Sequence, residues 1–287
     1  MTDLVSTTDF IIQAPAIPAA TVADLARQAG ARAVIPIGLG TPAAFRFPEV
    51  ERRDDLEEAA RDHGCDAAFV PHDRTIERVR LVAMDMDSTL ITIECIDEIA
   101  DMLGIKPQVA AITASAMRGE IEFAQSLTRR VALLAGLPLK KLEEVYDERL
   151  RISPGAQRML TAFKAIGAKT ALVSGGFTFF TERLRTRLGF DYTLANTLGV
   201  EDGKLTGEVE GSIVDAHAKA QAVRRLKQEF AASDGDLTVT LGDGANDLPM
   251  FDEADVSVAY RAKPVVRARA THAIDHCGLD AALNLFR

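Results

Sequence analysis

Short apolar runs alternate with amphipathic helical patterns from about residue 80 to the end of the chain. The apolar runs, each of strand length, are Leu81 to Met84, Lys169 to Val173, Thr238 to Leu241 and Val256 to Ala259. The helical patterns between them include Gly155 to Ile166, Thr178 to Leu188 and Ala216 to Phe230. This alternation predicts an α/β fold with a doubly wound parallel sheet, whose ligands bind at the carboxyl ends of the strands.

One interval departs from this rhythm. Between Leu90 and Arg151 the spacing of apolar residues is helical in several places, and no segment has a convincing strand pattern. We therefore expect an all-helical cap, roughly residues 92–150, inserted after the first strand and lying over the site.

The first eighty residues predict a separate small α+β domain. Its elements follow the order βαββαβ of the ferredoxin-like unit. They are expected at Phe10 to Gln13, Ala20 to Ala29, Ala33 to Ile37, Ala44 to Phe47 after a turn at Gly40-Thr41-Pro42, Asp54 to His63, and Ala67 to Val70. The polar stretch Pro71 to Glu77 predicts a linker, so we expect domains at 1–76 and 77–287. The topology of the first domain resembles an ACT-type ligand-binding module, and a docking or dimerisation role is the alternative.

Composition narrows the classes of function. With 33 Lys+Arg against 42 Asp+Glu, the net charge of −9 argues against nucleic acid and anionic membranes as partners. An anionic substrate then needs a metal ion or a few local cations. The three cysteines, Cys65, Cys95 and Cys277, have no disulfide or zinc spacing, and the N-terminus lacks a signal-peptide pattern. We expect a cytoplasmic protein.

Acidic residues follow the first strand of the second domain, in the sequence Asp85-Met86-Asp87-Ser88-Thr89. Two carboxylates so close together are costly unless a cation lies between them or one carries a proton. Asp85 could attack phosphorus, and Asp87 could protonate the leaving oxygen and then activate water. Helix capping by Asp87 or Ser88 is the alternative interpretation.

Two further strand ends carry polar residues. Gly242-Asp243-Gly244-Ala245-Asn246-Asp247 offers Asp243 as a metal ligand, and its hard oxygens suit Mg²⁺. Asn246 could bind a ligand group, while Asp247 could hold a coordinated water or orient Lys219. Ser174 and the glycines after it, with amides at a helix N-terminus, could form a phosphate cradle that also requires a cation such as Lys219.

In this order the four elements resemble the motifs of the haloacid dehalogenase (HAD) superfamily of phosphohydrolases. Asp85 and Asp87 match the first motif, Ser174 the second, Lys219 the third, and Asp243 with Asp247 the fourth. The resemblance covers roughly residues 80–285. It implies a HAD-like fold, an aspartyl-phosphate intermediate on Asp85, and Mg²⁺ held by Asp85, Asp243 and the backbone carbonyl of Asp87.

Within that superfamily the chain most resembles the phosphoserine phosphatases. The shared segments are Asp85 to Ala100, Met117-Arg118-Gly119, Phe123 to Val131 and Gly242 to Asp247. The resemblance implies that Glu94 receives the substrate ammonium and Arg130 its carboxylate, with Met117 and Phe123 on the apolar side. Ser174, Gly175, Lys219 and Asn246 are then expected at the phosphate. A pocket selective for an amino acid phosphate does require an anion for the ammonium group, a guanidinium for the carboxylate and a cradle for the phosphate.

The resulting expectation is Mg²⁺-dependent hydrolysis of O-phospho-L-serine, the last step of L-serine biosynthesis. Alternatives are another small phosphomonoester, transfer to a second alcohol, or an amino acid sensor with a vestigial catalytic domain. A serine effector at the N-terminal domain and a homodimer are compatible with the resemblance. Met86 departs from the superfamily, where an aromatic residue is frequent, and its side chain is expected to pack into the domain.

Overall fold

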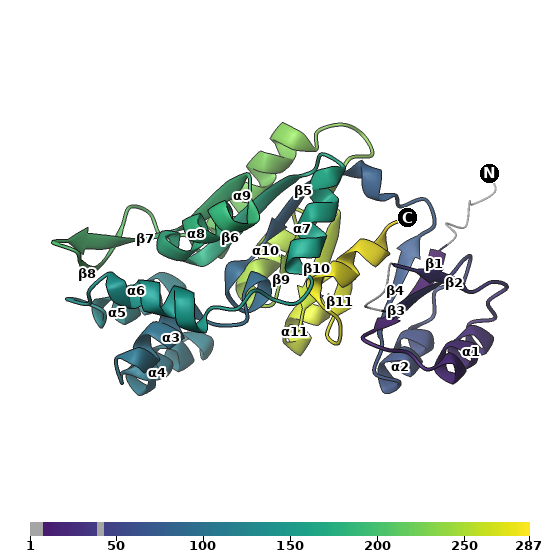
Figure 1. The fold of residues 1–287 in the computed structure, drawn as a ribbon, viewed down its shortest axis with the longest axis horizontal. Coiled ribbons are helices and arrows are strands. Elements are labelled where there is room, and N and C mark those ends of the chain that lie inside the picture. The colour runs from purple at the N-terminus through teal and green to yellow at the C-terminus, as the bar shows by residue number, and fades with distance from the viewer. Residues whose placement is uncertain (1–7, 39–42) are drawn as a thin grey trace.

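The computed structural model describes residues 8–38 and 43–287, so the turn expected at Gly40-Thr41-Pro42 lies outside the described residues. Within them the chain forms two sheets with no strand in common (Figure 1). The first has four strands in the order β2-β3-β1-β4, and the second has seven in the order β11-β10-β9-β5-β6-β7-β8.

The small N-terminal unit has the predicted βαββαβ order. Its elements are β1 (Thr8–Ala14), α1 (Ala19–Gln28), β2 (Ile35–Ile37), β3 (Ala43–Phe47), α2 (Asp54–Asp62) and β4 (Asp66–Pro71). All three strand pairings are antiparallel, and Phe10 and Ile12 of β1 alternate with Ile11 across the sheet. Phe10 and Ile12 pack with Leu25 and Leu56 of the two helices, whereas Ile11 belongs to the core on the other face. One face therefore binds the helices, and the other faces the second unit.

The larger unit is the predicted doubly wound sheet. Its strands are β5 (Val79–Met84), β6 (Lys169–Phe177), β7 (Tyr192–Glu201), β8 (Lys204–Glu210), β9 (Leu237–Gly242), β10 (Val256–Tyr260) and β11 (His272–Ile274). Its helices outside the cap are α7 (Ala156–Ala165), α8 (Thr178–Leu188), α9 (Ala216–Phe230), α10 (Leu248–Phe251) and α11 (Pro264–Arg267). Short helical turns lie at Ile76–Arg78, Met86–Leu90, Ala245–Asp247 and Leu279–Leu285. All the neighbouring strands from β11 to β7 run parallel, and only the β7–β8 pair is antiparallel.

The central strand β5 shows why helices cover both faces of this sheet. Leu81 and Ala83 face one hydrophobic cluster, and Val82 and Met84 face another, all without solvent exposure. A strand buried on both faces needs a continuous apolar run rather than an alternating one. Met86, just after this strand, is also fully buried, as expected.

The predicted cap is helical throughout. It consists of α3 (Cys95–Met102), α4 (Lys106–Met117), α5 (Phe123–Ala132), α6 (Lys140–Glu144) and a short turn at Val145–Arg149. The β7–β8 hairpin, which sequence analysis did not predict, lies against it (Figure 1). Backbone hydrogen bonds of 2.8 Å join Gly136 N–H to the Leu205 carbonyl and Leu205 N–H to the Leu137 carbonyl. The cap is thus attached to the main sheet through this hairpin.

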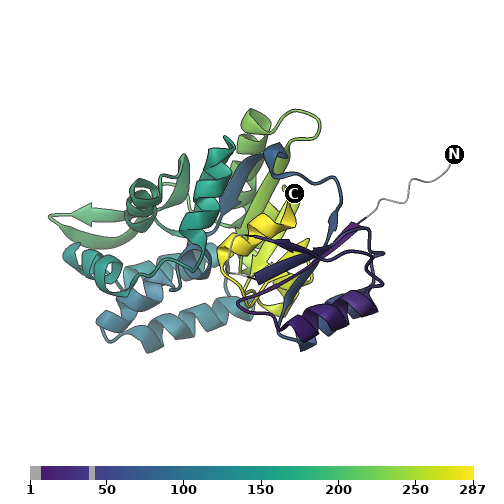
Figure 2. The same cartoon turned by 45° about the vertical axis from the view of Figure 1, so that its right-hand side comes forward.

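The small unit lies beside the C-terminal segment of the larger one (Figure 2), and polar contacts join the two units. The buried Arg46 donates hydrogen bonds to Asp9 and to the backbone carbonyls of Asn284 and Phe286. The Asp66 carboxylate accepts hydrogen bonds from the backbone N–H groups of residues 275–277. Because Asp66 and one guanidinium nitrogen of Arg46 have these partners across the interface, separating the units would leave buried polar groups without hydrogen bonds. No helix among the described residues is both long and apolar enough to span a membrane.

The buried His272 makes the stability of this interface depend on pH. Its Nε2 lies 2.7 Å from Nη1 of Arg74, and burial, together with the charges of Arg74 and Arg52, lowers its pKa from 6.5 to about 3. The unfolded chain therefore binds a proton that the folded chain excludes. We expect this group's contribution to the free energy of unfolding to be complete above pH 6.5 and to fall by up to ~1.4 kcal/mol per pH unit below it.

Urea unfolding of the wild type and of His272→Gln between pH 7.5 and 5 measures this contribution. The variant should lose stability less steeply than the wild type as the pH falls. Parallel pH profiles would show that His272 is not the group responsible.

Candidate active site

The predicted functional residues meet at one edge of the seven-stranded sheet. Because β9, β5 and β6 are neighbours and parallel, their carboxyl ends bring Asp243, Asp85 and Ser174 together. The Asp85 N–H donates to the carbonyl of Leu241 on β9 at 3.0 Å, which extends the pairing of the strands up to the site. The prediction that distant strand ends converge is confirmed.

Three carboxylates form the centre of the site. Oxygen atoms of Asp85, Asp243 and Asp247 lie within 4.8 Å of one another. Thr89 fixes Asp243 by donating a 3.0 Å hydrogen bond to Oδ1. Burial and then the charge of Asp247 raise the pKa of Asp85 well above its usual range and that of Asp243 to about 6. Such a concentration of acidic groups demands a cation.

Lys219 supplies one cation from the first turn of α9. It has no solvent exposure, and its Nζ lies 3.0 Å from Oδ1 of Asp85 and 2.6 Å from Oδ1 of Asp247. Burial alone would lower the pKa of Lys219, but the two carboxylates outweigh burial and raise it. Oδ2 of Asp247 accepts hydrogen bonds from the N–H groups of Asp243 and Gly244, which hold the carboxylate in place. Its other oxygen, Oδ1, contacts Nζ of Lys219. Of the two roles considered for Asp247, these contacts match the orienting one.

Asp87 follows Asp85 by two residues and directly precedes a sharp backbone turn at Ser88. Ser88 has a φ of 55°, a left-handed conformation that costs on the order of 1 kcal/mol in a residue other than glycine and is concentrated at functional sites. The Cys95 N–H donates to Oδ1 of Asp87 at 3.0 Å. Burial, followed by the nearby charge of Glu94, raises the pKa of Asp87 to about 7. A carboxyl group with this pKa can both give and take a proton near neutrality.

The residues expected to form a phosphate cradle lie at the carboxyl end of β6. Ser174 Oγ accepts a 2.9 Å hydrogen bond from the N–H of Gly176, and a Cβ at residue 176 would lie 2.7 Å from Oδ2 of Asp87. Only glycine therefore permits this close approach of backbone to carboxylate. Asn196 of β7 donates to the Gly175 carbonyl at 2.8 Å and accepts from the Val214 N–H at 2.8 Å.

A cavity of about 120 Å³ opens between these strand ends and the cap. Three of the predicted substrate-binding residues line it. They are the anionic Glu94, the guanidinium of Arg130 and the apolar Phe123. Ser88 Oγ donates to Oε1 of Glu94 at 2.6 Å, and burial lowers the pKa of Arg130. The remaining lining residues are Asp85, Asp87, Ile96, Leu127, Ser174, Gly175, Gly176, Phe177, Asp243 and Asn246. Phe123 and Arg130 share this face of α5, as their seven-residue spacing suggested, whereas Arg129 is not among the lining residues.

Three predicted site residues, Met117, Lys219 and Asp247, do not line the cavity. Met117 ends α4 with 68% of its surface exposed, so this structure does not place it on the apolar side of the pocket. Helix α4 packs on α3 and α5, and the Met117 side chain at its end is left in solvent. Lys219 and Asp247 are joined to the cavity lining by their contacts, since Nζ of Lys219 lies 3.0 Å from Oδ1 of Asp85, which does line the cavity.

Sequence analysis missed several residues that hold the site in place. Thr89, which binds Asp243, stands inside the first motif and could have been found there. The Cys95 N–H that binds Asp87 carries no signal in the residue type. Asn196 lies on a strand that was not predicted, so its contact with Gly175 could not be anticipated.

Clustered carboxyl groups, a buried lysine and a glycine-rich segment with Ser174, all at the ends of parallel strands, are an arrangement typical of phosphoryl-transfer sites. The family model of the haloacid dehalogenase-like hydrolases matches residues 82–252, and the chain belongs to that family. These hydrolases are metal-dependent, in agreement with the acidic cluster. Within the family the chain belongs with the phosphoserine phosphatases.

Relatives support this assignment at the level of sequence and structure. The phosphoserine phosphatase of Polaromonas sp. (strain JS666) is 50% identical over 220 residues, which cover 75% of this chain and 93% of the relative. An unliganded probable phosphoserine phosphatase from Vibrio cholerae superposes with a TM-score of 0.84 at 34% identity, covering 99% of this chain and 88% of that chain. A phospho-aspartyl intermediate analogue of phosphoserine phosphatase has a TM-score of 0.65 at 39% identity, covering 72% and 99%.

Proposed function

We propose that the chain hydrolyses O-phospho-L-serine to L-serine and phosphate, the last step of L-serine biosynthesis, through an aspartyl-phosphate on Asp85. The observation that carries this proposal is that one cavity is lined by Glu94 and Arg130 as well as by Asp85. A zwitterion with a phosphate ester presents the complementary charges. The phospho-aspartyl analogue of a similar enzyme supports the same intermediate.

The residues divide the reaction into two displacements. An Asp85 oxygen attacks phosphorus while Asp87 gives its proton to the departing serine oxygen. Asp87, now a carboxylate, takes a proton from water, and that water attacks phosphorus and restores Asp85. Ser174, the amides near Gly175, Lys219 and Asn246 hold the phosphoryl oxygens where charge is spread in the transition state.

Mg²⁺ is the metal that we propose for this site. The cluster of Asp85 and Asp243 offers hard oxygen atoms, which suit Mg²⁺ better than a transition metal, and the Asp87 backbone carbonyl would complete the protein ligands. When bound, the ion supplies positive charge to the transferring phosphoryl group. We expect removal of metal with EDTA to abolish phosphate release, and Mg²⁺ but not K⁺ to restore it. Unchanged turnover after chelation would contradict this assignment.

The cap has a proposed role in excluding water. Residues 92–149 lie over the cavity, so their closure would shield the first displacement and their opening would admit water for the second. Met117, exposed at the end of α4, is proposed to reach the substrate only in such a closed arrangement.

For the N-terminal unit we propose an ACT-like role with serine as effector, and association of two copies of the chain. Its βαββαβ topology and the exposed Val34 and Ile35 beside the edge strand β2 support these roles. We also propose domain limits at 1–76 and 77–287, since β4 ends at Pro71 and β5 begins at Val79. A cytoplasmic location is proposed from the three free cysteines. Phosphate-release assays with added serine and light scattering test the first two.

Substrate preference tests the proposed function. We expect phosphoserine to be hydrolysed at least about tenfold more efficiently (kcat/KM) than sugar phosphates, since these leave Glu94 and Arg130 unpaired. Phosphothreonine offers the same ammonium and carboxylate, and we expect it to be disfavoured because its extra methyl group has to fit the same cavity of about 120 Å³. Arg130→Gln should raise KM for phosphoserine by about 10- to 100-fold and affect sugar phosphates little.

Arg129→Gln is the matched control, because this neighbouring arginine does not line the cavity. A flat substrate profile would favour a phosphatase or phosphotransferase for another small phosphomonoester. Absence of turnover on every substrate would favour an amino acid sensor with a vestigial catalytic domain.

A further inference from the structure

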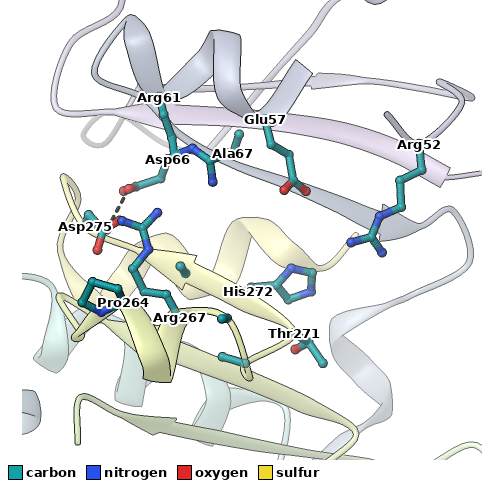
Figure 3. Close-up of a pocket in the computed structure, with 13 residues that line it drawn as sticks. Arg52, Glu57, Arg61, Asp66, Ala67, Pro264, Arg267, Thr271, His272 and Asp275 are labelled. Atoms are coloured by element: carbon teal, nitrogen blue, oxygen red, sulfur yellow. Dashed lines mark hydrogen bonds and ion pairs between the residues drawn. The ribbon is translucent and has the colours of Figure 1, made fainter. Parts of the chain in front are cut away.

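A second cavity, of about 540 Å³, lies between the two units and away from the phosphatase site. Figure 3 shows α2 and the start of β4 above it and the α11–β11 segment below it. Its lining residues are Arg52, Glu57, Arg61, Asp66, Ala67, Pro264, Arg267, Ala268, Ala270, Thr271, His272, Ala273 and Asp275. The hydrogen bonds of Asp66 to the backbone of residues 275–277 join the two walls of this cavity.

The acidic and basic residues of the lining are unequally engaged. Asp66 is occupied by the backbone N–H groups of residues 275–277, and Asp275 by Arg267 at 2.7 Å. Among the residues that the structure describes, no carboxylate lies within ion-pair distance of Arg52 or Arg61. Arg52 and Arg61 are exposed to solvent, and the charges of Glu57 and Asp275 act on them only at longer range, so both guanidinium groups have donors free for a ligand.

Their placement distinguishes this cavity from a uniformly basic surface. Arg61 and Arg52 extend from opposite ends of the upper wall, with the Glu57 carboxylate between them (Figure 3). Glu57 is half-buried and forms no ion pair with either arginine, and burial raises its pKa. The middle of the cavity thus favours a hydrogen-bond donor or an ammonium group, and the two ends favour anions.

His272 contributes a donor from the lower wall. Arg74 can only donate, so Nε2 of His272 must accept the 2.7 Å hydrogen bond and the proton of the neutral ring resides on Nδ1. The ring is more than nine-tenths buried and lines the cavity below Arg52 (Figure 3).

We propose that this cavity binds an elongated small dianion, one acidic group on Arg52 and the other on Arg61, with contacts to both units. Dicarboxylates and diphosphorylated molecules share this chemistry. A central amino group would add a contact to Glu57, so an acidic amino acid fits better than a simple dicarboxylate. Serine, with a single acidic group, fits this cavity less well. The site is independent of the catalytic residues.

Isothermal titration calorimetry on the full chain, freed of metal, tests the proposal. The probes are L-glutamate, glutarate and inorganic pyrophosphate, with acetate as the monoanion at matched ionic strength. We expect saturable binding of at least one dianion, weakened about tenfold or more by Arg52→Gln and by Arg61→Gln and lost in the double variant. Arg27→Gln, an exposed arginine on α1, is the control and should bind like the wild type.

The probes also identify the source of the dianion. Tighter binding of L-glutamate than of glutarate, lost in Glu57→Gln, indicates an amino dicarboxylate, and preference for pyrophosphate indicates a phosphorylated ligand. Absence of saturable binding for all three dianions, equal binding of acetate, or unchanged binding by the double variant would overturn the proposal. Phosphoserine hydrolysis by the Arg52 and Arg61 variants should stay at the wild-type level, so this test and that of the catalytic function can fail separately.

Discussion

Asp85→Asn should lower kcat for phosphoserine by about 10⁴-fold or more, because an amide cannot form the phosphoryl-enzyme bond and the whole double displacement depends on it. The fold should survive. The substitution removes one charge from a buried acidic cluster in which the pKa of Asp85 is already raised. Single-turnover phosphate release and thermal unfolding, measured on the same preparation, separate the two effects.

Asp252→Asn is the matched control for Asp85→Asn. Its carboxylate is exposed and pairs only with Arg269, so activity should not change. Turnover that persists in Asp85→Asn would remove Asp85 from the role of nucleophile. Loss of folding in that variant would instead show that its contact with Lys219 is structural.

Lys219→Met should be the most damaging substitution for stability in the site. It leaves Asp85 and Asp247 buried without their shared cation, which costs about 3–5 kcal/mol in the free energy of unfolding. Loss of its charge near the phosphoryl oxygens should also lower kcat by roughly 10²- to 10³-fold. Urea unfolding and steady-state kinetics measure the two losses.

Two further variants make the Lys219 result interpretable. Lys227→Met, on the same helix, removes a partly exposed ion pair with Asp255 and should cost at most about 1 kcal/mol. Adding Asp247→Asn to Lys219→Met removes one unpaired charge and should restore part of the stability without restoring activity. Equal destabilisation by Lys219→Met and Lys227→Met would contradict a special role for the buried lysine.

Much of the fold and site could be predicted because the relevant signals are local. The apolar run Leu81 to Met84 and the acidic turn after it identify a buried parallel strand and its ligand-binding end. Parallel pairing then brings Asp85, Ser174 and Asp243 together without further information. Arg130 was preferred to Arg129 by resemblance and by its spacing from Phe123, and it does line the cavity.

The β7–β8 hairpin was missed although it carries a turn signal. Asp202 and Gly203, both with positive φ, form an Asp-Gly turn of the kind that joins antiparallel strands. Strand β8 does alternate in burial, but its central inward residue is Gly207, and β7 shows no regular alternation, so the strand signal is weak. The position of Met117 could not be predicted either, because the direction of a helix end depends on how the cap packs rather than on local spacing.

The hairpin also bears on how the cap can move. Strand β7 carries at its outer end the hairpin that is hydrogen-bonded to the cap, and farther inward Asn196, which binds the Gly175 carbonyl. A rigid swing of the cap therefore has to take the hairpin with it or break those backbone hydrogen bonds. If the hairpin moves with the cap, the displacement is passed to strand β7 and, through Asn196, to the backbone at Gly175. The position of the cap and that of the segment expected to bind phosphate are then coupled through one strand.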